Sequence, residues 1–279
     1  MTEPNRPSKM RREIRLPSAR LACVVSLGVL LLSVGLYYGL MIRSQIALIR
    51  AIERDGGAVT TKPVGPKWLR QLVPVKSFQG IDRIVEVYSP TGTEADLSAL
   101  SKQTDLQAVL LHHSQVTDEG VKHLSGLSGL QYISFDSTQL SDEGLKHLST
   151  LSHLRSLSLG STQVTDEGLK HLSTLSHLKS LSLQSTQVTD EGLKHLSGLS
   201  ELQELDLEST QVTGDGLKYL SGLLGLEYLS LNSTQMTDEN LKHLFALSGL
   251  QAVYLVSTRV TPDGVVDLQR HLPNCDVGR

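Results

Sequence analysis

The chain has 279 residues, of which 39% are hydrophobic and 20% charged, and its net charge at pH 7 is −3. Residues 1–55 hold nine Lys/Arg and four Asp/Glu, a net of +5, so residues 56–279 carry −8. This acidic body argues against nucleic acid as a partner, and 2 cysteines, Cys23 and Cys275 at opposite ends of the chain, exclude a disulfide-bonded scaffold.

The first 42 residues have the pattern of a membrane anchor. Residues 1–20 form a basic tail, which we expect to stay in the cytoplasm. Leu21 to Ile42 follows with 22 residues and no charge, and at 1.5 Å per residue this length spans a bilayer core of about 30 Å. We therefore predict a single transmembrane helix over Leu21 to Ile42, with everything after it in the periplasm or outside the cell.

A cleaved signal peptide is the alternative for the same segment. Ser33-Val34-Gly35 has small residues at the spacing of a cleavage site, after an apolar run of about a dozen residues. The anchor is favoured because apolar sequence continues well past Gly35.

Residues 43–80 read as a stalk, a linker and an N-terminal cap. Ile46, Ile49 and Ile52 recur at helical spacing, which predicts a short amphipathic extension of the anchor helix. Gly56 and Gly57 end that pattern, and a Pro- and Gly-rich stretch follows. We expect the apolar residues from Trp68 through Phe78 to cover the open end of what comes next.

Residues 81–279 are built from a 24-residue unit that is most regular over Leu154 to His177. Its first leucine recurs without a slip at Leu106, Leu130, Leu154, Leu178, Leu202, Leu226 and Leu250. Within the unit, Leu157 and Leu159 alternate as in a strand, and Leu169, Leu172 and Leu175 recur as in a helix. A Thr or Ser precedes each helix as a candidate N-cap, at Thr117, Ser141, Thr165, Thr189, Thr213, Thr237 and Thr261. A degenerate unit counted from Asp82 precedes the seven, and Leu250 to Leu272 reads as the C-terminal cap.

The LxxLxL strand, turn and helix opening T-D-E-G-L resemble the leucine-rich repeat of the ribonuclease-inhibitor-like and F-box-associated class, and the whole chain resembles bacterial membrane-anchored leucine-rich-repeat proteins. The slot of the family's turn Asn or Cys holds hydroxyls: Ser114, Thr138, Thr162, Thr186, Thr210, Thr234 and Thr258. The resemblance implies an α/β solenoid, a horseshoe with a concave parallel sheet and convex helices. For function it implies macromolecular recognition.

The repeated polar residues do not predict catalysis. His123, His147, His171, His195 and His243 share one slot, but neighbouring helices stand about 8–10 Å apart, too far for one metal ion. The Asp-Glu pairs that open most of the helices place negative charge where the helix dipole favours it, which explains them without catalysis. No nucleophile, zinc, phosphate-loop or calcium-loop motif occurs. We expect no enzyme activity, no cofactor and no metal.

The outward positions of the strands differ from unit to unit, which favours them as the binding surface. Small residues follow one another on two units, and three carboxylates on the next strand favour a cationic partner. Tyrosines on the units beyond suit contact with a protein. The predicted partner-binding residues are Tyr132, Asp136, Glu204, Asp206, Glu208, Tyr228, Asn232 and Tyr254. The alternative is a solvated polar sheet.

The sequence thus predicts a membrane-anchored, non-catalytic module that binds a protein or peptide on its concave face. Two alternatives remain: an envelope scaffold that associates with copies of itself, and an adaptor that recruits substrates to an enzyme.

Overall fold

The computed structural model describes residues 40–64 and 82–279. Residues 21–39 of the predicted membrane helix, and the predicted cap from Trp68 through Phe78, lie outside these ranges. The chain divides into two units, Met1–Gln45 and Ile46–Arg279. In the first, residues 40–45 are helical. Within the described ranges, no helix has both the length and the hydropathy to cross a bilayer.

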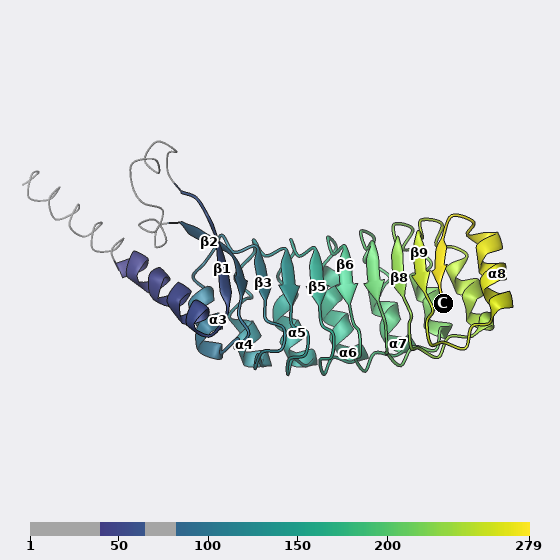
Figure 1. Cartoon of the computed structure of the whole chain (residues 1–279), viewed down its shortest axis with the longest axis horizontal. Coiled ribbons are helices and arrows are strands. Elements are labelled where there is room, and N and C mark those ends of the chain that lie inside the picture. The colour runs from purple at the N-terminus through teal and green to yellow at the C-terminus, as the bar shows by residue number, and fades with distance from the viewer. Residues whose placement is uncertain (1–39, 65–81) are drawn as a thin grey trace, which may run out of the picture. The chain divides into compact units, whose positions relative to one another are not determined.

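The second unit is built on one ten-stranded sheet in which spatial order follows chain order (Figure 1). The strands are β1 Ala58–Lys62, β2 Arg83–Tyr88, β3 Ala108–Leu110, β4 Tyr132–Ser134, β5 Ser156–Ser158, β6 Ser180–Ser182, β7 Glu204–Asp206, β8 Tyr228–Ser230, β9 Ala252–Tyr254 and β10 Asp276–Gly278. From β2 to β10 every pairing is parallel, whereas β1 is antiparallel to β2. The predicted parallel-sheet solenoid is confirmed.

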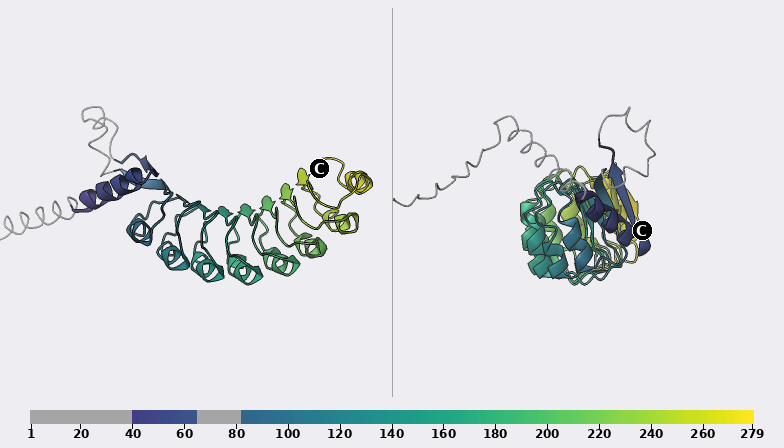
Figure 2. Two further views of the ribbon diagram at one scale, coloured as in Figure 1. Left: turned by 60° about the horizontal axis from the view of Figure 1, so that its bottom comes forward. Right: turned by 90° about the vertical axis from the view of Figure 1, so that its left-hand side faces the viewer.

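Short helices alternate with the strands along the chain. They are α3 Glu94–Leu100, α4 Asp118–Lys122, α5 Asp142–Leu148, α6 Asp166–Leu169, η2 Lys170–Thr174, α7 Asp190–Leu193, η3 Lys194–Leu196, η4 Asp215–Leu220, η5 Asp238–Leu244 and α8 Pro262–His271, where η marks a 3₁₀-helix. The 3₁₀ segments agree with leucines spaced three apart, since residues i and i+3 eclipse in that helix. Within Ile46–Arg279 the strands line the concave side of an arc and the helices its convex side (Figure 2). Strands about 4.8 Å apart and helices about 8–10 Å apart cause this curvature.

The core is a continuous stack of leucines from successive repeats. The first leucine of each unit, from Leu106 to Leu250, is buried, and Phe135 is fully buried among them. At the turn, six threonine hydroxyls donate to the carbonyl three residues earlier at 2.5–2.7 Å: Thr138, Thr162, Thr186, Thr210, Thr234 and Thr258. The threonine at the position of the family's turn asparagine therefore stabilises its own turn through a hydrogen bond within the repeat. Ser114 is the exception, since its buried Oγ has no partner among the described residues.

Both ends of the stack are covered. At the first end Leu48, Ile49 and Ile52, from the helical stretch 46–54, are buried in the core. These residues belong to the segment that the sequence assigned to a stalk, so part of that segment covers the repeats. At the other end α8 begins after the N-cap Thr261 with Pro262 at its first position, and β10, which the sequence did not indicate, extends the sheet beyond Pro273.

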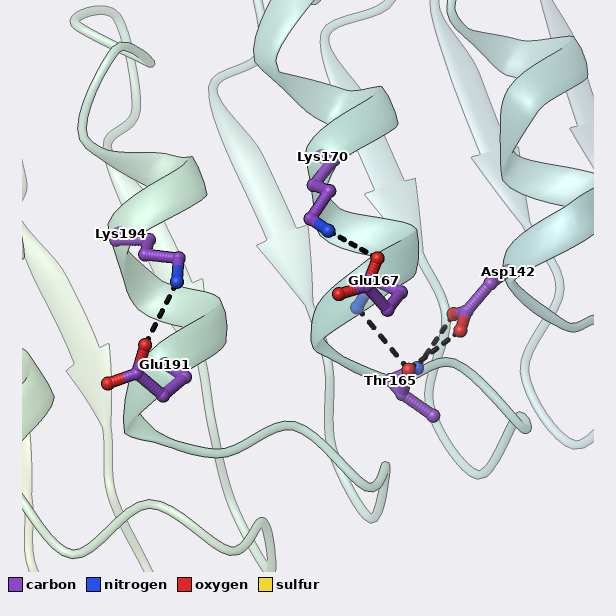
Figure 3. A network of polar contacts seen from close by, with 6 residues as sticks. All are labelled: Asp142, Thr165, Glu167, Lys170, Glu191 and Lys194. Carbon is purple, nitrogen blue, oxygen red and sulfur yellow. Dashed lines mark hydrogen bonds and ion pairs between the residues drawn. The ribbon is translucent and has the colours of Figure 1, made fainter.

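A second set of bonds joins each helix start to the next repeat. The carboxylate of Asp142 accepts both the backbone N–H (2.8 Å) and the hydroxyl (2.6 Å) of Thr165, which in turn accepts from the N–H of Glu167 (3.3 Å; Figure 3). We call this pair of hydrogen bonds, from the backbone N–H and the hydroxyl of one residue to an aspartate of the preceding repeat, a bracket. Equivalent brackets join Asp118 to Ser141, Asp166 to Thr189, Asp190 to Thr213 and Asp238 to Thr261. A Cβ at Gly168 would overlap the Asp142 carboxylate, which explains a glycine early in the helix despite its low helix propensity.

The sixth unit shows why that glycine is needed. There Gly214 (φ 106°) stands where the other units have the bracketing aspartate. The next unit has Asn240 in the glycine slot, and the Asn240 Oδ1 accepts from the backbone N–H (3.2 Å) and hydroxyl (2.7 Å) of Thr237. The two exceptions compensate each other. The prediction of a Thr or Ser N-cap at every helix is wrong in two units: Gly214 rather than Thr213 precedes η4, and Thr117 makes no capping bond.

Candidate recognition surface

The register of the sheet places the outward residues of successive strands in lateral rows. In one row Tyr132 is beside Ser156, Ser156 beside Ser180, Ser180 beside Glu204 and Glu204 beside Tyr228. In the next row Ser182 is beside Asp206 and Ser230 beside Tyr254. The two rows contain five of the predicted site residues, Tyr132, Glu204, Asp206, Tyr228 and Tyr254, and Asp136, Glu208 and Asn232 follow the ends of these strands.

Large apolar side chains lie at two ends of this surface. Leu110 (37% exposed) and Tyr132 (48%) lie on neighbouring strands near its start. Tyr228 (40%), Tyr254 (41%) and Val256 (45%) lie near its end. Protein contact surfaces are enriched in tyrosine relative to the rest of the surface. The serines of β5 and β6 separate the two groups.

Asp136 organises the floor of this serine stretch. Its Oδ1 accepts from the Ser158 hydroxyl (2.5 Å) and the Gly160 N–H (2.7 Å), and its Oδ2 accepts from the Ser134 hydroxyl (3.0 Å). It is half-buried. A carboxylate with three internal donors holds two repeats together, so Asp136 is the predicted site residue whose bonding capacity is most fully used within the fold.

The three carboxylates on and after β7 accept fewer strong hydrogen bonds within the fold than Asp136 does. Glu204 accepts from the Ser180 hydroxyl at 2.8 Å, and Asp206 accepts from the Glu208 N–H at 2.9 Å and weakly from the Ser182 hydroxyl at 3.4 Å. Glu208 is 3.4 Å from the amide nitrogen of Asn232. Among the described residues, none of the three carboxylates is in an ion pair. Three negative charges therefore face the concave side without a cation.

The neighbouring polar side chains hold the aromatic end in place. The Tyr228 hydroxyl donates to the Gln251 side-chain oxygen at 3.2 Å, and the Gln251 amide donates to Glu227 at 2.9 Å. The Asn232 Oδ1 accepts the Val256 N–H at 2.8 Å. Asn232 thus links two repeats, and Tyr228 is oriented before any partner arrives.

On the convex side the charges pair with one another. Lys146 binds Glu143, Lys170 binds Glu167 and Lys194 binds Glu191, each three residues apart (the last two in Figure 3). The hydrogen bond from Lys170 holds the pKa of Glu167 below its ordinary value, and Lys194 does the same to the pKa of Glu191. Burial lowers the pKa of His195. In the described part of the chain no three His, Cys, Asp or Glu side chains are grouped as metal ligands would be.

A basic hollow beside the sheet was missed by the sequence reasoning. It encloses about 230 Å³ and is lined by Gln131, His153, Arg155, His177, Lys179 and Glu201. We call it the rim hollow. Its residues occupy the two slots around the first leucine of the unit, and reading these slots across units would have shown His153 and His177 beside Arg155 and Lys179.

Part of the repeat region matches a known family model. Residues 150–173, 174–197 and 200–221 match the family model described as Leucine Rich repeat. No curated protein matches the chain. Among solved structures, internalin C2 of Listeria monocytogenes is similar at 26% identity and a TM-score of 0.48, over 66% of this chain and 83% of that one. An internalin F of the same organism is similar at 19% identity and a TM-score of 0.38, over 65% and 69%.

Proposed function

We propose that this leucine-rich-repeat protein is a non-catalytic recognition module that binds a protein or peptide on the concave face of β4–β9. We further propose that Leu21 to Ile42 anchors it in the cytoplasmic membrane, with the basic tail inside and the repeats outside. The anchor proposal is supported by the 22 uncharged residues and by the basic flank that precedes them.

The observation that carries the recognition proposal is the unpaired acidic and aromatic surface on β7–β9. Glu204 and Asp206 have no cation among the described residues, while Tyr228 and Tyr254 expose two-fifths of their area beside them. On four of the convex helices, by contrast, a glutamate is paired with a lysine three residues later. Carboxylates without an ion-pair partner next to exposed tyrosines suit a partner segment with basic and apolar side chains.

The direct test is capture of a partner with the full-length chain, followed by charge reversal on the surface. Glu204→Lys with Asp206→Lys should weaken binding of the captured partner by about tenfold or more, because each reversal converts an attraction into a repulsion. The matched control is Glu167→Lys with Glu191→Lys on the convex helices, which changes the net charge equally. Equal binding by both double variants at low salt would exclude this surface.

The self-associating scaffold has one observation in its favour. In the described part of the chain β10 pairs only with β9, so its other edge is open to a strand from a second molecule. If the full-length chain captures mainly itself, and a proline at Val277 in β10 abolishes the capture, the scaffold replaces our proposal.

A further inference from the structure

The rim hollow concentrates cations in a way that no other part of the repeat frame does. The slot before each strand holds Gln107, Gln131, Arg155, Lys179, Gln203, Glu227 and Gln251 in turn. The slot before each first leucine holds Asp105, Gly129, His153, His177, Glu201, Gly225 and Gly249. In both slots the basic residues fall in the same two adjacent units. The register of the sheet therefore brings four basic side chains into one hollow.

The two permanent charges of the hollow have no counter-charge of their own. Neither Arg155 nor Lys179 is within 4.0 Å of a carboxylate among residues 40–64 and 82–279. The acidic residue that lines the hollow, Glu201, is engaged by His177 at 2.9 Å. Four lysines of the convex helices, by contrast, reach a glutamate one turn away: Lys122, Lys146, Lys170 and Lys194. A guanidinium and an ammonium that line one hollow without an ion-pair partner are suited to bind an oxyanion.

The hollow borders the acidic carboxylates of β7. The Lys179 carbonyl accepts the backbone N–H of Glu204 at 2.9 Å, and Ser180, the next residue, donates its hydroxyl to the Glu204 carboxylate. Neighbouring strands are about 4.8 Å apart, and an extended peptide advances about 3.3 Å per residue. The positive and negative sites are thus separated by the span of one or two residues of an extended peptide.

We propose that the rim hollow is a subsite for an oxyanion carried by a peptide, held by Arg155 and Lys179 with His153 and His177 beside them. The oxyanion is a carboxylate or a phosphoryl group, and a basic residue one or two positions away on the same peptide lies against Glu204 and Asp206. This inference rests on the proposed function and deepens it, because it defines the charge pattern of the partner.

The test uses fluorescence anisotropy of the full-length chain at physiological salt with three labelled peptides of equal length. Each carries a lysine two positions from its variable residue, which is glutamate, phosphoserine or glutamine. The variant is Arg155→Gln with Lys179→Gln. The matched control is Arg259→Gln with Lys242→Gln, which removes one Arg and one Lys from exposed positions away from the hollow.

We expect the glutamate or the phosphoserine peptide to bind at least about tenfold more tightly than the glutamine peptide, and the tighter of the two identifies the oxyanion. Arg155→Gln/Lys179→Gln should abolish that difference, and the control should retain it. Equal affinity for all three peptides, or the same loss in both variants, would overturn the subsite.

The outcome separates this inference from the proposed function. If a captured protein partner is released by Glu204→Lys/Asp206→Lys but not by Arg155→Gln/Lys179→Gln, the concave face binds its partner and the rim subsite is wrong. If the acidic peptides bind through Arg155 and no protein partner responds to any concave variant, the subsite stands and the recognition proposal fails.

Discussion

The convex and concave sides of the repeat unit differ in how many of their charged side chains form ion pairs. On the convex side the same residues return in nearly every unit, and many of them have a bonding partner one turn or one repeat away, as in Glu167–Lys170 and Asp142–Thr165. On the concave side the residues change from unit to unit, and Glu204, Asp206, Arg155 and Lys179 have no ion-pair partner in the described part of the chain. Residues that recur in every unit therefore serve the packing of the repeats. The outward strand residues, which differ from unit to unit, are the ones we assign to partner binding.

The largest expected effect contrasts two aromatic residues three positions apart. Phe135 points into the core and is fully buried, whereas Tyr132 on the same segment is about half exposed. Phe135→Ala should lower the free energy of unfolding by about 3–5 kcal/mol because it leaves a cavity, and Tyr132→Ala should lower it by less than about 1 kcal/mol. Urea denaturation of the two variants measures the contrast, and similar losses would mean that Tyr132 is part of the packing frame.

The sixth unit allows the convex bracket to be tested by exchange. Gly214→Asp alone would bring a Cβ against Met236 and Asn240 at a positive φ, and should cost about 1–3 kcal/mol. Asn240→Gly alone removes the bonds to Thr237 and should cost about 1 kcal/mol. The double variant restores the pattern of the other units, so it should lose less than the sum of the two single changes. Strict additivity would show that the two exceptions are unrelated.

A stabilising substitution is expected at the turn after each strand. Ser137, Ser161, Ser185, Ser209 and Ser233 all have φ near 55°, the left-handed region that disfavours residues with a Cβ. Ser185→Gly should therefore raise the unfolding free energy by up to about 1 kcal/mol, offset in part by the greater freedom of glycine in the unfolded chain. Ser173→Gly, at an exposed 3₁₀-helical position without a positive φ, is the control and should destabilise.

The smallest effect concerns pH. Because Lys170 lowers the pKa of Glu167, that carboxylate contributes stability above its ordinary value of 4.5, and the contribution is lost as the pH falls through its lowered folded-state pKa. Both partners are exposed, so the effect on stability is minor. Carbon-detected NMR titration should place the pKa of Glu167 and of Glu191 below 4.5. Lys170→Gln should return only Glu167 to its ordinary value, and a shift that survives this change would assign it to another group.

Much of this architecture could be read from leucine spacing. The first leucines set the register, and the alternation of Leu157 with Ser156 and Ser158 placed inner and outer residues correctly. The features that were missed depend on contacts between repeats. The Asp136 carboxylate accepts hydrogen bonds from donors 22 and 24 residues later, which no pattern within one unit shows. Likewise the rim hollow is lined by residues of adjacent units that lie side by side only in the folded solenoid. The three residues of β10 are too short to show alternation, and their strand conformation comes from pairing with β9.

The most direct measurement of the central claim is site-specific photo-crosslinking with the full-length chain in its native cells. A photoreactive side chain would replace Tyr228 on the concave face in one variant and Lys242 on a convex helix in the other. The account predicts crosslinks to a distinct protein from position 228 and none to that protein from position 242. Equal crosslinking from both positions, or crosslinks from 242 alone, would contradict recognition on the concave face.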